Sequence, residues 1–386
     1  MHGVLGLYIH IPFCKSKCAY CDFYSLSDKT EKNAYLDCLL KELRSEKHYI
    51  DGNQLSTIYF GGGTPSLLNA EDYKFLFENI SREYDSSHCN EITLEANPDD
   101  LNPAYLKSVS GLPFNRISMG IQSFQDKELR ALGRRHDAAQ AIEAVKHCRE
   151  AGLNNISIDL MFGIPEQDEL SLQSNIEQAL KLEVPHISVY MLSLEPGSRL
   201  YKDWQQGRFT EISDEQAEQR YFLISDRLKQ AGYEQYEISN FARPGHRAVH
   251  NSSYWKGQPY LGLGPSAHSF NGNSRRWNPA SLQSYLRGVQ SGSLAREEDR
   301  LDLYTSYNEL IMIRLRTKEG FSTEELQTRY GQDLYHYCLQ QAGPLLKSGL
   351  LEKEEDRLKL AYRAYFVSDS VIRALFWDGG KADKRK

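Results

Sequence analysis

Short apolar segments alternate with amphipathic segments over the first two-thirds of the chain. Helical periodicity is found near residues 31–47, 70–83, 102–109, 137–151 and 169–182; in the fourth, Ala141, Val145 and Cys148 share an apolar face and Gly152 suits the C-terminal cap. Strands alternating with helices predict a parallel sheet, either open or closed into a barrel, although six strands are fewer than the eight of a complete barrel. The six predicted strands are rich in β-branched and aromatic residues and cover residues 7–13, 57–60, 91–96, 116–121, 155–162 and 186–192.

The pattern changes after Pro196. A helix is expected near 213–231, and the following aromatic and glycine-rich stretch is predicted to be irregular and functional. Residues 300–376 favour a small helical unit with a β-wing near 351–362, and the polar, basic end favours a frayed tail. The predicted division of the chain is 1–232, 233–299, 300–378 and 379–386.

The overall composition narrows the class of protein. The chain has 386 residues, of which 40% are hydrophobic and 25% charged, so it can bury a sizeable core. No apolar run approaches the roughly 18 residues of a membrane span. A net charge of -6 argues against a large nucleic-acid surface. The first residues lack the pattern of a signal peptide, so a cytoplasmic protein is expected.

Three of the seven cysteines lie close together, as Cys14, Cys18 and Cys21 directly after the first predicted strand. Thiolates at this spacing can hold zinc or an iron–sulfur cluster. Structural zinc needs four ligands, and no fourth Cys or His follows nearby. A cubane cluster with three thiolates would keep one iron open to a ligand. The other four cysteines are scattered, which favours structural roles as small apolar residues.

Polar groups follow several other predicted strands. The second strand ends at Gly61-Gly62-Gly63-Thr64-Pro65, where glycine permits a close approach of backbone to a ligand and Thr64 adds a hydroxyl. Because the C-terminal ends of parallel strands meet at one edge, these groups should lie near the cysteines. Further polar residues at or after strand ends are Glu95, Gln122, Arg134 and Asp159. Their two carboxylates, one amide and one guanidinium suit a zwitterionic ligand that carries hydroxyls.

The run from Tyr8 to Cys21, together with the glycine-rich turn, resembles the radical S-adenosylmethionine (SAM) superfamily. It resembles in particular the branch that contains oxygen-independent coproporphyrinogen III oxidase and the HemW-type haem chaperones, over nearly the whole chain. The resemblance implies an α/β fold, a partial (β/α)6 radical SAM barrel with a small C-terminal winged-helix-like domain. It implies that Cys14, Cys18 and Cys21 hold a 4Fe–4S cluster whose fourth iron is chelated by SAM. An electron donor would reduce this cluster, which can cleave SAM to methionine and a 5′-deoxyadenosyl radical. The SAM-contacting positions that it implies are Tyr8, Gly62, Gly63, Thr64, Glu95, Gln122, Arg134 and Asp159.

Two features favour the chaperone branch over the oxidase. The oxidase pattern has a further Cys two residues after the third, where this chain has Phe23. The oxidase also has a longer N-terminal segment before its first strand. In addition, His268 lies at a position that is apolar in the oxidase's second-SAM region, which weakens the case for an oxidase pocket.

The segment from His250 to Trp255 matches the HNxxYW motif of the chaperone branch. A neutral imidazole can ligate haem iron, and Tyr254 and Trp255 offer aromatic faces to a porphyrin. A hydrogen-bonded histidine that stabilises an irregular loop is the alternative, and His246 is a weaker candidate ligand. Basic residues that could pair with haem propionates, or form a solvated basic loop, are Arg243, Arg247, Lys256, Arg275 and Arg276.

The resulting hypothesis is a cytoplasmic haem chaperone that contains a SAM-bound 4Fe–4S cluster and delivers haem to haem-requiring proteins. Peripheral membrane association is compatible with it, and no nucleic-acid partner is expected. The main alternative is the oxidase, which decarboxylates coproporphyrinogen III in porphyrin biosynthesis. A winged-helix nucleic-acid binder is a third possibility, disfavoured by the acidic net charge and the lack of a dense basic helix.

Overall fold

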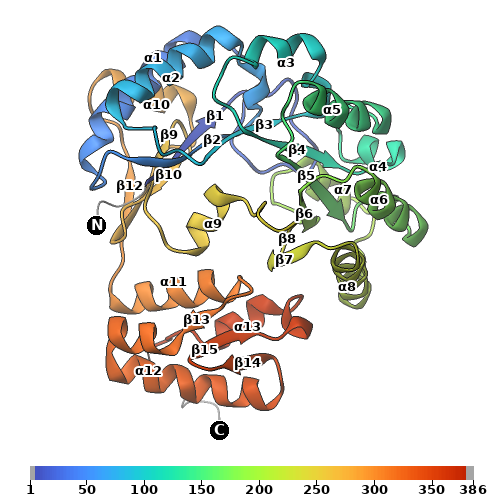
Figure 1. The fold of residues 1–386 in the computed structure, drawn as a ribbon, viewed down its shortest axis with the longest axis vertical. Helices are drawn as coiled ribbons and strands as arrows, with labels where there is room; N and C mark the ends of the chain where they lie inside the picture. Colours follow the sequence, from blue (N-terminus) through green and yellow to red (C-terminus); the bar gives the residue numbers. More distant parts are fainter. Residues whose placement is uncertain (1–4, 380–386) are drawn as a thin grey trace.

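The computed structural model describes residues 5–379, and its centre is a curved parallel sheet (Figure 1). Six strands pair in sequential order, each parallel to the next. They are β1 (Leu5–Ile11), β2 (Leu55–Gly62), β3 (Glu91–Ala96), β4 (Arg116–Gln122), β5 (Ile156–Phe162) and β6 (His186–Met191). The connecting helices lie on the outer side of the arc and are α1 (Lys32–Ser45), α2 (Ala70–Glu83), α3 (Pro103–Val109), α4 (Asp126–Ala131), α5 (Ala138–Glu150) and α6 (Glu169–Lys181).

Local sequence signals explain why these elements form where they do. Asn69 and Asp72 form a reciprocal capping box at the start of α2, and Asp137 and Gln140 do the same for α5. The strands are buried on both faces, as in a parallel sheet covered by helices. The expected barrel strands and helices agree with the structure to within about two residues at their ends. The short helices α4 and α7 (Arg199–Gln205) were not predicted.

The sheet does not close on itself, so the barrel is partial, as expected. Strand β1 pairs on its other side with β9 (Tyr260–Leu263), and β6 pairs with β8 (Asn240–Ala242). The chain reaches β8 through α8 (Asp214–Gln230) and β7 (Glu234–Glu237). Beyond β9 the sheet continues through β10 (His268–Phe270), β11 (Ser274–Trp277) and β12 (Glu297–Arg300), with α10 (Leu282–Gln290) between the last two.

The prediction that residues 233–299 are irregular is therefore wrong. This segment extends both edges of the barrel sheet, and between them the chain crosses as helix α9 (Val249–Trp255). Its strands have only three or four residues each, too short to produce a clear periodic pattern. They are stabilised by pairing with strands that are distant in the sequence.

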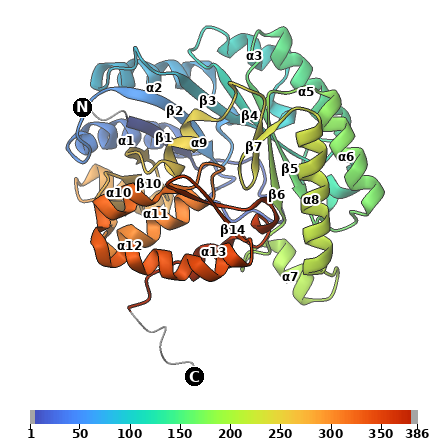
Figure 2. The ribbon, with the colours of Figure 1, turned by 60° about the horizontal axis from the view of Figure 1, so that its bottom comes forward.

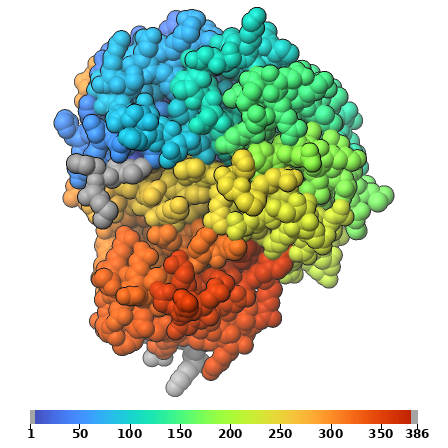
Figure 3. Space-filling model, in the orientation of Figure 1, coloured from blue at the N-terminus to red at the C-terminus, as the bar shows by residue number. Residues whose placement is uncertain are grey.

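The C-terminal unit lies on the open side of the arc (Figures 1 and 2). It contains α11 (Leu303–Leu315), α12 (Thr323–Lys347) and α13 (Ser368–Ala374). Strands β13 (Phe321–Ser322), β14 (Leu351–Glu354) and β15 (Arg357–Leu360) form a small sheet, whose β14–β15 hairpin is the expected wing. Residues of α9 and the short strands around it lie between this unit and the barrel on the face seen in Figure 3. The predicted tail, 379–386, lies outside the described residues except for Gly379.

Candidate functional site

A cavity of about 540 Å³, here called the barrel cavity, lies inside the partial barrel. The three clustered cysteines and all eight predicted SAM residues line it. Strands β1 to β5 contribute these side chains from their C-terminal halves or the loops that follow, which is where barrel folds bind ligands. The eight residues are Tyr8, Gly62, Gly63, Thr64, Glu95, Gln122, Arg134 and Asp159.

The cysteine loop is held against the end of β2. The backbone N–H of Thr64 donates to the carbonyl of Phe13 at 2.7 Å, and the hydroxyl of Thr64 lies 3.2 Å from the sulfur of Cys14. All three cysteines are partly exposed. Among residues 5–379 no three metal-ligating side chains converge on a single ion. A cubane cluster does not require such convergence, because each thiolate binds a different iron, so the sulfur donor set fits the cluster.

Glycine is required where β2 meets this loop. A Cβ atom on Gly63 would lie 2.7 Å from the carbonyl oxygens of both Ile11 and Phe13. Gly62 has a φ of 102°, and a Cβ there would lie 2.5 Å from the ring of His10. The glycine-rich turn therefore lets the backbone of β2 approach the cysteine loop closely.

The end of β4 has an unusual backbone conformation. Gln122 has a φ of 73°, in the left-handed region, and the pairing of β4 with β5 shifts register between Gly120 and Gln122. Such strain in a residue other than glycine is common at ligand sites. The strained residue, Gln122, itself lines the barrel cavity.

Arg134 connects the cysteine loop to two strand ends. Its Nη1 donates to the sulfur of Cys18 at 3.1 Å, and its Nη2 donates to the side chain of Asn97 and the carbonyl of Gly120. Its Nε is buried and has no partner within the described chain. A buried donor without an acceptor is costly, so this atom fits a ligand that supplies an acceptor such as a carboxylate.

Two buried carboxylates, Glu95 and Asp159, line the barrel cavity. Burial, together with the charge of the nearby Asp159, raises the pKa of Glu95 to about 7. Burial likewise raises the pKa of Asp159 to about 6. Glu95 accepts hydrogen bonds from the hydroxyl of Tyr59 at 2.5 Å and the N–H of Gly62 at 3.2 Å. A cationic ligand would lower both pKa values and be bound by the resulting charges.

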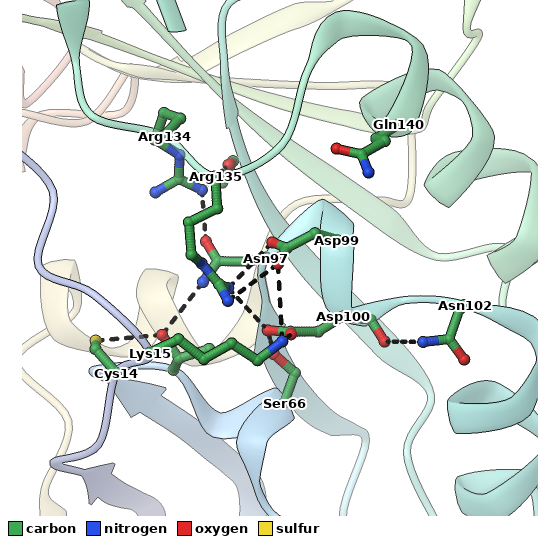
Figure 4. A network of polar contacts seen from close by, with 12 residues as sticks. Cys14, Lys15, Ser66, Asn97, Asp99, Asp100, Asn102, Arg134, Arg135 and Gln140 are labelled. Atoms are coloured by element: carbon green, nitrogen blue, oxygen red, sulfur yellow. Dashed lines mark hydrogen bonds and ion pairs between the residues drawn. The ribbon is translucent and has the colours of Figure 1, made fainter. Parts of the chain in front are cut away.

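A network of charged residues that includes the cavity-lining Arg135 was not predicted from the sequence (Figure 4). Asp99 and Asp100 follow β3, and both pair with Lys15, next to Cys14, and with Arg135, next to Arg134. Asp100 also accepts a hydrogen bond from Ser66 at 2.9 Å. The network therefore fixes the cysteine loop relative to the Arg134 segment. The one available signal was the polar run that follows Glu95.

His250 lies in α9, at the opposite end of the strands from the cysteines. Its Nδ1 is 2.7 Å from the hydroxyl of Thr57 and its Nε2 is 2.7 Å from that of Tyr254. The ring stacks on Tyr59 with 4.9 Å between centroids, and the residue is 1% exposed. Burial, with the charge of Arg116, lowers the pKa of His250 to about 3, so the ring is neutral. In this conformation the imidazole stabilises α9, as in the alternative considered from the sequence.

Helix α9 is held in place by Glu91, the first residue of β3. The helix has no side-chain cap of its own, and both oxygens of Glu91 accept its first N–H groups, from Val249 at 2.8 Å and His250 at 2.9 Å. Glu91 is itself paired with the buried Arg116. Because His250 and Tyr254 are four residues apart, both face the sheet.

A second cavity, also of about 540 Å³ and here called the side cavity, adjoins the first. Tyr8, Phe23 and Tyr254 line both. The side cavity lies between β9–β10, α9 and helices α11 and α12 of the C-terminal unit. Of the predicted haem residues, Tyr254 and Trp255 line it and His250 does not. His268, which was not predicted to bind haem, lines it as well.

The five basic residues predicted for propionates do not converge. Lys256 and Arg275 line the side cavity. Arg247 instead pairs with Glu234 and Glu319, and Arg276 with Glu46 and Glu298. Arg243 lies over the ring of Tyr233. His246, the weaker candidate ligand, is exposed and lines neither cavity.

Known proteins share both parts of this architecture. The family model "Radical SAM superfamily" matches residues 8–179, and "HemN C-terminal domain" matches residues 301–367. Heme chaperone HemW of Bacillus subtilis is 34% identical over 370 residues, which cover 95% of this chain and 98% of that protein. The chain belongs to the HemW family. It is thus a member of the radical SAM superfamily, which implies a 4Fe–4S cluster and SAM.

Other relatives extend the comparison. Heme chaperone HemW of Haemophilus influenzae is 36% identical over 342 residues, covering 85% of this chain and 86% of that one. A mitochondrial protein of Danio rerio, "Radical S-adenosyl methionine domain-containing protein 1", is 32% identical and covers 82% of this chain and 74% of that one. The structure of coproporphyrinogen III oxidase HemN from Escherichia coli superimposes with a TM-score of 0.83 at 23% identity, covering 97% of this chain and 90% of that chain. This last likeness concerns the fold. No helix within residues 5–379 combines the length and apolar character of a membrane span.

Proposed function

We propose that the protein is a haem chaperone, which binds haem and delivers it to haem-requiring proteins, and that it contains a SAM-bound 4Fe–4S cluster. The observation that carries this proposal is the similarity to heme chaperone HemW over 95% of the chain. Haem-accepting proteins, an electron donor for the cluster and a cytoplasmic location belong to the same proposal.

The cluster ligands in this proposal are Cys14, Cys18 and Cys21, since they are partly exposed thiols on one loop at the barrel cavity. The unpartnered Nε of Arg134 would donate to the carboxylate of SAM, and Glu95 and Asp159 would balance its positive charges. The remaining contacts to SAM would come from Tyr8, Gly62, Gly63, Thr64 and Gln122. When bound, the cluster supplies electrons and SAM supplies a source of radical chemistry.

The residues of the chain provide shape, charge and exclusion of water. Tyr59 and the N–H of Gly62 orient Glu95. The Asp99–Asp100 network fixes the position of Cys14 relative to Arg134, because it pairs with the residue that follows each of them. Such preorganisation of the binding groups is the protein's contribution in cofactor-dependent sites.

The HNxxYW motif belongs to the proposed haem-binding region. Trp255 and Tyr254 line the side cavity, and His250 hydrogen-bonds to the hydroxyl of Tyr254. The sequence-based assignment of the haem iron to His250 remains a prediction, and ligation would require one of its two hydrogen bonds to break.

A parallel anaerobic assay distinguishes this function from that of the oxidase. Reconstituted protein is offered haem in one sample and coproporphyrinogen III, SAM and a reductant in another. The proposal predicts a stable haem complex and no accumulation of protoporphyrinogen. Decarboxylation at roughly 0.1–100 per second, the ordinary range of enzyme turnover, would contradict it. Failure of the protein to bind haem would contradict it equally.

A further inference from the structure

The side cavity combines the surfaces that a metalloporphyrin requires. Its walls carry aromatic and aliphatic side chains from three parts of the fold: Trp255 of α9, Phe270 of β10, and Met312 and Ile313 of α11. A volume of about 540 Å³ lies within the usual range of small-molecule sites. Phe23, which also lines this cavity, is 67% exposed and offers a further aromatic face.

The same cavity contains cations without partners. Among the described residues neither Lys256 nor Arg329 forms an ion pair, whereas Arg275 pairs with Glu309 at 2.7 Å. Two further donors of lining residues, Nε1 of Trp255 and Nε of Arg275, are buried without an acceptor. Buried donors without acceptors are rare in folded proteins. A ligand with carboxylate oxygens would satisfy them.

One metal-capable imidazole is available in this cavity. The His268 ring is stacked against Trp277, with 5.6 Å between centroids and 19° between planes, and the residue is exposed. Neither ring nitrogen of His268 has a hydrogen-bond partner in the part of the chain that the structure describes. Partial burial of the ring and the charge of Arg275 lower the pKa of His268, so the ring is neutral and a nitrogen lone pair is available.

His250 differs from His268 in each of these respects. It is 1% exposed, both of its ring nitrogens are hydrogen-bonded, and it lines the barrel cavity. His10, which does line the side cavity, also has both ring nitrogens engaged, with Tyr8 at 3.1 Å and the carbonyl of Tyr24 at 2.9 Å. The geometry therefore separates a structural histidine from a free one.

We propose that haem binds in the side cavity, with His268 as its iron ligand and with Lys256 and Arg329 facing its propionates. This inference rests on the proposed haem-chaperone function and adds the location and ligand. The porphyrin plane lies among Trp255, Phe270 and Met312, and His250 acts as a positioning residue that holds α9 in place. Because Tyr8, Phe23 and Tyr254 line both cavities, the haem site adjoins the SAM site.

Haem titrations of the full-length, cluster-loaded protein test this proposal. The variants are His268→Ala, His250→Ala and, as a matched control, His246→Ala, an exposed histidine outside both cavities. We expect His268→Ala to shift the Soret band and weaken haem binding at least about tenfold, the lower limit seen even for second-shell metal partners. His246→Ala should behave as the wild type. Because His268 is exposed, its variant should keep the wild-type melting temperature.

A second pair of variants tests the anion contacts. Lys256→Ala combined with Arg329→Ala should weaken haem binding about two- to fivefold per charge, as expected for solvent-exposed ion pairs. The control removes two exposed cations elsewhere, in Lys41→Ala combined with Lys353→Ala, and should leave affinity unchanged.

The outcomes are distinguishable. An unaltered Soret band in His268→Ala, together with its loss in folded His250→Ala, would overturn the assignment to His268 and leave the chaperone function intact. Unaltered affinity in the Lys256/Arg329 double variant would overturn the placement of the propionates. Absence of haem binding by the wild type would overturn both the inference and the proposed function.

Discussion

Arg134 donates a hydrogen bond from Nη1 to the sulfur of Cys18, over 3.1 Å. A residue assigned to SAM therefore also contacts a proposed cluster ligand, and its remaining buried donor, Nε, has no acceptor in the described chain.

Arg134→Ala should weaken SAM binding by about 1.5–3 kcal/mol, the cost of a lost charge-assisted hydrogen bond. Calorimetry on cluster-loaded protein measures this. Arg130→Ala, an exposed arginine on α4, is the control and should bind SAM normally. Equal SAM affinity in both variants would refute the placement.

The cysteine loop gives a direct prediction about iron. Wild-type protein reconstituted without air should contain about four irons per chain, from the cluster type. Replacing Cys14, Cys18 and Cys21 together by Ser should remove them. Cys89→Ser is the control, because this partly exposed thiol lies on another loop and donates to the carbonyl of Glu91, as a hydroxyl can. Full iron content and unchanged absorbance in the triple variant would disprove the ligand set.

SAM affinity should depend on pH. Glu95 and Asp159 have pKa values raised to about 7 and about 6, so both are largely neutral below pH 5 and ionised above pH 8. Since SAM carries positive charge, its affinity should fall as the pH is lowered through this range, by at most about tenfold per pH unit for each carboxylate. Titrations from pH 5 to pH 8 measure this slope. Glu95→Gln and Asp159→Asn should each flatten the profile, and a profile that is flat in the wild type would contradict the assignment.

Asp100 should control how firmly the cysteine loop is held. Its side chain is 4% exposed and pairs with both Lys15 and Arg135. Asp100→Asn removes the charge but keeps the shape, and should lower the free energy of unfolding by about 1–3 kcal/mol, because the two partners are partly exposed. The cluster absorbance should also decay faster in air. Asp72→Asn, which removes the charge that pairs with Lys32 away from the cysteine loop, is the control for cluster decay. Wild-type decay in Asp100→Asn would show that the network does not hold the loop.

The sequence predicted the barrel and its ligand-binding edge well, for a physical reason. Parallel strands bring their C-terminal ends together, so residues as distant as Cys14 and Asp159 were expected at one site, and both line the barrel cavity. Helix α9 could not be predicted, because its N-terminal N–H groups are capped by Glu91, more than a hundred residues earlier. The side cavity could not be predicted either, since it depends on how α11 and α12 pack beside β10.

His250 should contribute strongly to stability. His250→Ala removes the partner of the Thr57 and Tyr254 hydroxyls and leaves a cavity beside Tyr59, so the free energy of unfolding should fall by about 2–4 kcal/mol. Tyr254→Phe removes only one of these hydrogen bonds and should cost about 0.5–1.5 kcal/mol. Denaturant unfolding of the apoprotein measures both. Wild-type stability in His250→Ala would show that the imidazole does not stabilise α9.

The central claim is that the protein passes haem on, and the kinetics of transfer test it most directly. Haem-loaded protein is mixed in a stopped-flow instrument with the haem-free form of a b-type haem protein, and the shift of the Soret band is followed. Delivery through a complex of the two proteins predicts a transfer rate that rises with acceptor concentration and exceeds the rate of haem release to a passive scavenger. A transfer rate equal to that release rate at every acceptor concentration would contradict the account.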